Sequence, residues 1–81
     1  MTIYNIQNKK DLITVDLRMK QIRYVSGEDI KFFDISNDDV MGYEYLYDHV
    51  KTKFLDCVIE DLESNLGIKV NKKDLKFVKL Q

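Results

Sequence analysis

The sequence predicts an α+β fold in which a small, mostly antiparallel sheet of about five strands packs against one long central helix. Three observations support this prediction. Short apolar runs bounded by turn residues fill residues 2–35, a capped helical pattern covers about 37–66, and two more short apolar runs follow at 68–80. The chain has 81 residues, no proline and no Gly/Ser-rich linker, so we expect a single domain over residues 1–81.

The N-terminal part of the chain predicts four strands in meander order. Residues 2–7 and 12–18 alternate apolar with polar side chains around an Asn-Lys-Lys-Asp turn at 8–11, a pattern that is typical of a hairpin. The apolar parity changes after the second run, which indicates a turn or bulge before a third strand at 21–26. A fourth strand is expected at 30–35.

One helix is predicted over residues 37–66. Ser36 is the expected N-cap, with Asp39 three residues later as in a capping box, and Gly67 fits a left-handed C-cap. A helix of this length spans about 45 Å. A compact domain of this size has a diameter of only about 30 Å. Either the helix therefore breaks, with Met41-Gly42 as the best candidate, or one end projects and needs a partner.

The last predicted element is a second hairpin at 68–80. Its turn at 71–74 repeats the Asn-Lys-Lys-Asp sequence of 8–11, and the ten residues from Asn8 match the ten from Asn71 at seven positions. The shared residues occupy turn and core positions, whereas the differing ones are mostly expected on the surface. The repeat therefore predicts two similar hairpins that bracket the helix, and it argues against reading the turn as a binding motif.

The apolar stripe of the predicted helix changes face along its length. In the second half, apolar side chains occupy an arc that polar side chains hold in the first half; they are Leu55, Ile59, Leu62 and Leu66. Two interpretations stay open for this wide apolar arc. Strands and the C-terminal hairpin wrap it, or it forms the contact face of a homodimer.

Charge is distributed unevenly along the chain. Residues 28–66 hold eleven acidic and three basic residues, whereas residues 1–27 have a net charge of +3 and residues 67–81 a net charge of +4. The whole chain has a formal net charge of −1. An acidic centre between two basic ends permits partners of either sign.

The composition also predicts where the protein is found. The chain holds no apolar run of about 18 residues, and its N-terminus lacks the basic and then apolar pattern of a secretory signal. Cys57 is the only cysteine, so an internal disulfide is excluded. We therefore expect a cytoplasmic protein that works without a membrane, in a reducing compartment.

The sequence shows no catalytic motif. His49 and Cys57, the sole histidine and cysteine, are eight residues apart on the predicted helix, a rise of about 12 Å that is too long for a base to activate a thiol. Asp56, Glu60 and Glu63 share one helix arc but lack the looped oxygen geometry that calcium prefers. We therefore expect no enzymatic activity, no cofactor and no metal.

The polar arc of the helix is the first candidate for function. Tyr45 lies there among carboxylates, and tyrosine is enriched at the hot spots of protein interfaces. The predicted partner-binding face consists of Tyr45, Glu44, Asp48, His49, Asp56, Glu60 and Glu63. We expect a small inhibitor or regulator that binds a basic surface of a partner protein, by steric blocking or nucleic-acid mimicry. In composition alone, the chain looks like the small inhibitors that phages and other mobile elements direct at host nucleases.

The lysine-rich ends of the chain support an alternative, a nucleic-acid-binding module. Its predicted contacts are Lys9, Lys10, Lys72, Lys73 and Lys76, at turns and on the last strand. A pI near 5.7 and the lack of an RNA-recognition, helix-turn-helix or zinc-finger motif argue against it. Lysines at turns and strand edges also have a structural use, because they discourage edge-to-edge aggregation.

Overall fold

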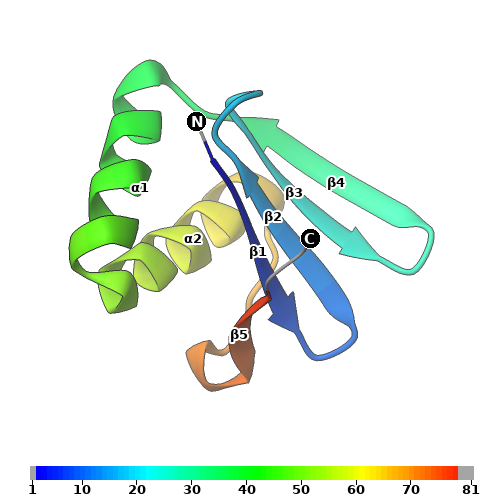
Figure 1. Cartoon of the computed structure of the whole chain (residues 1–81). Coiled ribbons are helices and arrows are strands. Elements are labelled where there is room, and N and C mark those ends of the chain that lie inside the picture. The colour runs from blue at the N-terminus through cyan, green and yellow to red at the C-terminus, as the bar shows by residue number, and fades with distance from the viewer. Residues whose placement is uncertain (1, 79–81) are drawn as a thin grey trace.

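The computed structural model describes residues 2–78 and confirms the α+β class. Its elements in chain order are β1 (Ile3–Asn8), β2 (Asp11–Asp16), β3 (Gln21–Ser26), β4 (Asp29–Asp34), α1 (Asn37–His49), α2 (Lys51–Leu66), a short 3₁₀ turn (Lys72–Asp74) and β5 (Leu75–Val78). The strands form one sheet in the order β4-β3-β2-β1-β5, and every neighbouring pair is antiparallel (Figure 1). The predicted meander of the first four strands is therefore confirmed.

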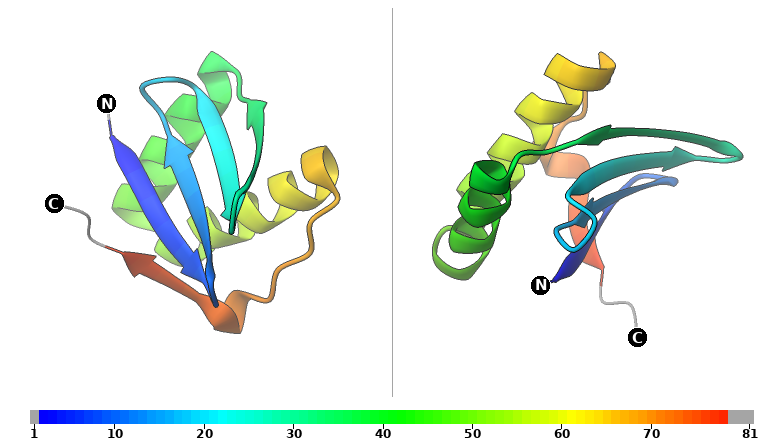
Figure 2. Two further views of the ribbon diagram at one scale, coloured as in Figure 1. Left: turned by 90° about the vertical axis from the view of Figure 1, so that its right-hand side faces the viewer. Right: turned by 90° about the horizontal axis from the view of Figure 1, so that it is seen from above.

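Both helices pack on the same face of the sheet (Figure 2). The core lies between them and the sheet, where Tyr4, Val15 and Ile22 are neighbours across β1, β2 and β3. The buried apolar side chains are Tyr4, Ile6, Ile13, Val15, Leu17, Ile22, Tyr24, Ile35, Val40, Tyr43, Phe54, Val58, Leu62 and Leu75. Within residues 2–78, no helix or strand covers the other face of the sheet, which we call the open face.

The predicted single helix is wrong in one respect, because the structure has two helices that run in different directions (Figure 1). The break lies at Val50 and not at Gly42. Val50 has extended backbone angles (φ −141°, ψ 82°), its N–H donates to the carbonyl of Leu46, and its carbonyl accepts from Phe54. One residue thus ends α1 and begins α2.

The break follows from the size of the molecule and from the turning apolar stripe. The principal extents are 29 × 27 × 23 Å, so a straight helix of about 45 Å would leave one end without a core to cover. A bend at Val50 lets Tyr43 of α1 and Leu62 of α2 face the same sheet although they lie on different arcs of a straight helix. Gly42 stays helical because no packing conflict arises there.

Both outer helix ends agree with the sequence prediction. The Ser36 hydroxyl accepts a hydrogen bond from the Asp39 backbone N–H at 3.1 Å, as an N-cap does. Gly67 has φ +67°, and its N–H donates to the carbonyl of Glu63. The next N–H, of Ile68, donates to Leu62, which completes a left-handed C-cap.

The predicted C-terminal hairpin at 68–80 is wrong. Residues 68–71 form no strand, and the second Asn-Lys-Lys-Asp segment forms a 3₁₀ turn in which the Asn71 side chain accepts from the N–H of Lys73. β5 then pairs with β1, where Lys76 lies opposite Gln7. Lys79 and Leu80, which were predicted to extend this strand, lie outside the described residues. The edge of β1 is the pairing partner of β5. Because the two strands are far apart in the sequence, no local pattern of residues predicts this pairing.

Alanine substitutions at two glycines should change stability in opposite directions. Gly67→Ala forces a side chain into the left-handed region and should lower the free energy of unfolding by about 1 kcal/mol. Gly42→Ala, at a helical position with open space around the added carbon, should raise it by about 0.5 to 1 kcal/mol. Urea unfolding measures both, and a fall with Gly42→Ala equal to that of Gly67→Ala would contradict the cap assignment.

Candidate functional site

The side of α1 that faces away from the core carries three exposed side chains at four-residue spacing. We call Met41, Tyr45 and His49 the α1 stripe. Met41 is 68% exposed and Tyr45 is 61% exposed, while Val40 and Tyr43 of the same helix are buried. The rings of Tyr45 and His49 lie against each other with centroids 4.3 Å apart. Tyr45 is therefore placed as the sequence predicted, and Met41 is a neighbour that the sequence analysis missed.

The predicted acidic face does not form one surface, because the break at Val50 divides it. Glu44 and Asp48 lie on α1 with Tyr45, whereas Asp56, Glu60 and Glu63 lie on α2. Asp56 pairs with Lys72 at 2.8 Å, so its charge is balanced within the chain. Glu60 lines a separate groove between the helices, and Glu63 is exposed near the end of α2.

The groove between α1 and α2 has a volume of about 170 Å³. It is lined by Asp38, Asp39, Gly42, Tyr43, Leu46, Cys57, Glu60 and Asp61. The Tyr43 hydroxyl donates a hydrogen bond to Asp61, and burial followed by this bond raises the pKa of Tyr43 strongly. Burial and then the nearby carboxylates raise the pKa of Cys57, so its thiol stays protonated at neutral pH and is a poor nucleophile.

The lysines of the alternative site are brought together in part. Lys9, Lys73 and Lys76 line a surface hollow of about 400 Å³ together with Gln7 and Asp74, which we call the lysine hollow. Lys72 instead turns to Asp56, and Lys10 does not line the hollow. Its lining residues come from the β1–β2 turn and the 3₁₀ turn and from the strands next to them, and the two turns lie at the same end of the sheet (Figures 1 and 2).

A hydrogen-bonded chain holds the β1–β2 turn beside this hollow. The Asn8 amide donates to the Tyr24 hydroxyl at 2.9 Å, and that hydroxyl donates to the Asp11 carboxylate at 2.6 Å. The hydrogen bond from Tyr24, and then one from Ser26, lowers the pKa of the Asp11 carboxyl. The first copy of the repeat is therefore clamped through β3, whereas the second copy is held by its own Asn71 cap.

The predicted dimer face is used within the fold. Leu62 is fully buried, and Leu55, Ile59 and Leu66 are half-buried against the core. The apolar arc on α2 thus packs mainly within the chain, as the first of the two interpretations predicted, and the homodimer stays a prediction.

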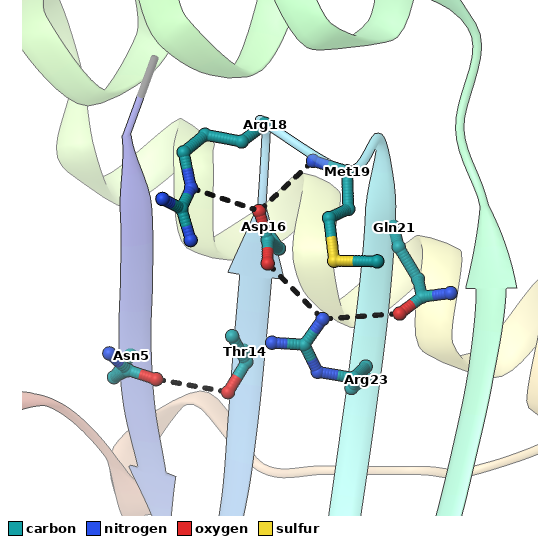
Figure 3. Close-up of polar contacts among 7 residues, drawn as sticks. All are labelled: Asn5, Thr14, Asp16, Arg18, Met19, Gln21 and Arg23. Atoms are coloured by element: carbon teal, nitrogen blue, oxygen red, sulfur yellow. Dashed lines mark hydrogen bonds and ion pairs between the residues drawn. The ribbon is translucent and has the colours of Figure 1, made fainter.

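The open face of the sheet carries a polar cluster that the sequence analysis did not find (Figure 3). Asp16 is 2% exposed, and its carboxylate accepts from the Met19 backbone N–H at 3.1 Å and from Arg23 at 3.2 Å. Arg18 approaches the same carboxylate at 3.9 Å. Beside it, the Thr14 hydroxyl donates to Asn5 at 2.9 Å. Asp16 therefore fixes the β2–β3 turn, and the only sequence signal was a carboxylate in an alternating strand.

Removing the Asp16 carboxylate should destabilise the fold. Asp16→Ala leaves Arg23 without its buried partner and the Met19 N–H without an acceptor, so we expect a loss of about 2 kcal/mol in the free energy of unfolding. Asp34→Ala is the matched control, because this carboxylate is exposed on the same face of the sheet. Its removal should lower the free energy of unfolding by less than about 0.5 kcal/mol. Equal urea midpoints for the two variants would contradict the role of Asp16.

The turn clamp should be visible in a pH titration. Tyr24→Phe removes the hydroxyl and should raise the pKa of Asp11 toward its ordinary value. Since the lowered pKa stabilises the fold above the unfolded carboxyl's pKa, the stability difference between the wild type and Tyr24→Phe should shrink as pH falls below about 4. Carbon NMR of the Asp11 carboxyl measures the shift, with Tyr45→Phe as the control; an unchanged titration in Tyr24→Phe would refute the clamp.

Three further observations bear on function. No group of three or more His, Cys, Asp and Glu side chains among residues 2–78 is arranged to hold a metal ion. Neither helix in this part of the chain is long and apolar enough to cross a membrane. Comparison of the chain with protein-family models, curated proteins and solved structures gave no match.

Proposed function

We propose that this protein is a non-enzymatic interaction protein that uses the α1 stripe to bind a basic surface of a partner protein. One observation carries the proposal: Met41 and Tyr45 are both more than half exposed on a helix whose opposite side is already buried in the core. One side of α1 already packs against the core, so apolar side chains on its other side do not contribute to the packing of the domain. Exposed methionine and tyrosine together are typical of interface centres.

The charges around the stripe select the partner. Asp38, Glu44 and Asp48 surround Met41 and Tyr45 on the same helix, and the described part of α1 holds no lysine or arginine. Carboxylates at the rim of an interface steer a positively charged surface into contact and reject an acidic one. Tyr45 then supplies the apolar contact area, and its ring is kept in place by His49.

The mode of action that we propose is inhibition or regulation by covering the partner's basic surface. Such surfaces are common on enzymes that bind nucleic acid, so the carboxylates of the helix layer would take the place of phosphates. Support comes from the eight acidic residues against two lysines in residues 37–66, and from the small size of the chain. A cytoplasmic protein of a phage or other mobile element, directed at a host enzyme, remains our prediction.

Truncating Tyr45 should abolish partner capture while the fold stays intact. We expect Tyr45→Ala to weaken binding by at least about tenfold, because an aromatic anchor at an interface centre carries much of the binding energy. Tagged wild-type and variant proteins are used to recover partners from the source cells, and the affinity of the recovered partner is then measured with purified components. Phe32→Ala is the matched control, since Phe32 is 56% exposed on the open face.

Electrostatics give a second readout on the same complex. Asp48→Asn should slow association and reduce the salt dependence of the association rate, because Asp48 lies at the rim of the stripe. If the same partner is recovered equally by the wild type, Tyr45→Ala and Phe32→Ala, the α1 stripe is not the binding surface. Loss of the partner with Phe32→Ala alone would move the interface to the open face.

A further inference from the structure

The two copies of the Asn-Lys-Lys-Asp repeat lie side by side in the structure. Pairing of β5 with β1 places Leu75 opposite Asn8 and Lys76 opposite Gln7, so each strand brings its own copy of the repeat to the same end of the sheet. Residues of both copies line the lysine hollow, and Lys9 of the first copy pairs with Asp74 of the second. Segments about sixty residues apart in sequence thus build one surface feature.

The lysine hollow carries an excess of positive charge. Three lysines line it, Lys9, Lys73 and Lys76, against one acidic residue, Asp74. That carboxylate is 3.9 Å from the Lys9 ammonium, whose side chain is 74% exposed, so the pair is loose and well solvated. Lysine has three donors and no acceptor, so an anion that enters the hollow can accept hydrogen bonds from several of these side chains at once.

The backbone at Lys9 has a conformation that is uncommon for lysine. Lys9 has φ +56°, in the left-handed region where glycine or asparagine is the usual residue. The turn therefore holds a lysine at a position where glycine would fit with less strain. Lys20, in the β2–β3 turn, has nearly the same φ of +54°, so this conformation belongs to the hairpin turns of the chain, and the lining residues are what distinguish the hollow.

Hydrogen bonds hold the backbone of the three lysines in place. The Gln7 amide donates to the carbonyl of Lys9 at 3.0 Å, and the Asn71 side chain accepts from the N–H of Lys73 at 3.0 Å. Lys76 lies within the β1–β5 ladder. Only the ends of the three side chains have to become ordered when an anion binds, which lowers the entropic cost.

We propose that the lysine hollow is a phosphate-binding site, in which the ammonium groups of Lys9, Lys73 and Lys76 hold the oxygens of a phosphate group. A phosphate offers three strong acceptor oxygens and more negative charge than a carboxylate, which suits a hollow lined by three lysines. The phosphate comes either from a free phosphate compound or from the backbone of a nucleic acid. This site is separate from the α1 stripe, so either proposal stands without the other.

The test titrates isotope-labelled protein with three ligands and follows the amide signals of Gln7, Lys9, Lys73 and Lys76 by NMR. The ligands are inorganic pyrophosphate, a single-stranded oligothymidylate of about 12 nucleotides, and an oligoglutamate peptide.

Lys73→Gln and Lys76→Gln should each weaken phosphate binding by about fivefold. Lys9→Gly should do the same while its thermal unfolding temperature stays equal or rises, because glycine fits the turn. Lys53→Gln, on the exposed surface of α2, is the control.

Two outcomes support the site and identify its source of phosphate. If pyrophosphate and oligothymidylate bind with equal affinity per phosphate group, the phosphate at this site comes from a free phosphate compound. Tighter binding of the oligonucleotide, with affinity that falls steeply between about 50 and 200 mM salt and a salt slope that drops by about one in Lys73→Gln, indicates a nucleic-acid backbone. The proposal is overturned if neither phosphate ligand shifts these amides, if Lys53→Gln weakens binding as much as Lys73→Gln, or if oligoglutamate binds as tightly as the phosphates.

Discussion

The structure depends on the burial of one aromatic ring, that of Phe54. Its side chain has no exposed surface, and it meets the aromatic rings of four residues from three other elements, at centroid distances between 5.2 and 5.9 Å: Tyr4, Tyr43, Tyr47 and Phe77. Edge-to-face contacts of this kind add to the free energy gained from burying the rings. Because β1, β5, α1 and α2 all contribute to the cluster, it joins both helices to the first and last strands, which are neighbours at one edge of the sheet. The Phe54 N–H also donates to the carbonyl of Val50, so the same residue that fills the core belongs to the bend between the helices.

Both surfaces to which we assign a function follow from this packing. With Tyr43 directed at Phe54, the helical period turns Met41 and Tyr45 outward, where both side chains stay more than half exposed. With Phe77 held in the same cluster, β5 lies along the edge of β1, and the lysines on either side of that edge come together. The acidic helices and the basic sheet end are thus separate parts of one small molecule. A protein with this charge distribution can present a carboxylate-rimmed surface and a cationic hollow at the same time.

Local features of the fold could be predicted from the sequence because they depend on residues close together in the chain. Ser36 and Gly67 mark helix ends through contacts within three to five residues, and the strand alternation of residues 2–35 needs only the pleat of the sheet. The exposure of Tyr45 followed from helical periodicity alone. By contrast, the size of the domain indicated that the helix either breaks or projects, but the position of the break at Val50 could not be predicted, because extended backbone angles suit a β-branched residue in many contexts. The separation of Asp56 and Glu60 from Tyr45 is a consequence of that bend.

The two Asn-Lys-Lys-Asp segments differ in what their sequence determines and what the tertiary structure determines. By itself the sequence determined that residues 8–11 and 71–74 are turn-like, lysine-bearing and followed by strands, since Asn and Asp side chains bond to their own neighbouring backbone. Only the tertiary structure decided that the first copy is a hairpin turn clamped by Tyr24, that the second is a 3₁₀ turn, and that the two lie against each other. The physical reason is that residues 68–71 form no strand with which β5 could pair, whereas the edge of β1 offers backbone groups already ordered by β2. Long-range pairing of this kind depends on which edge is free after the core has formed, and no local pattern of residues carries that information.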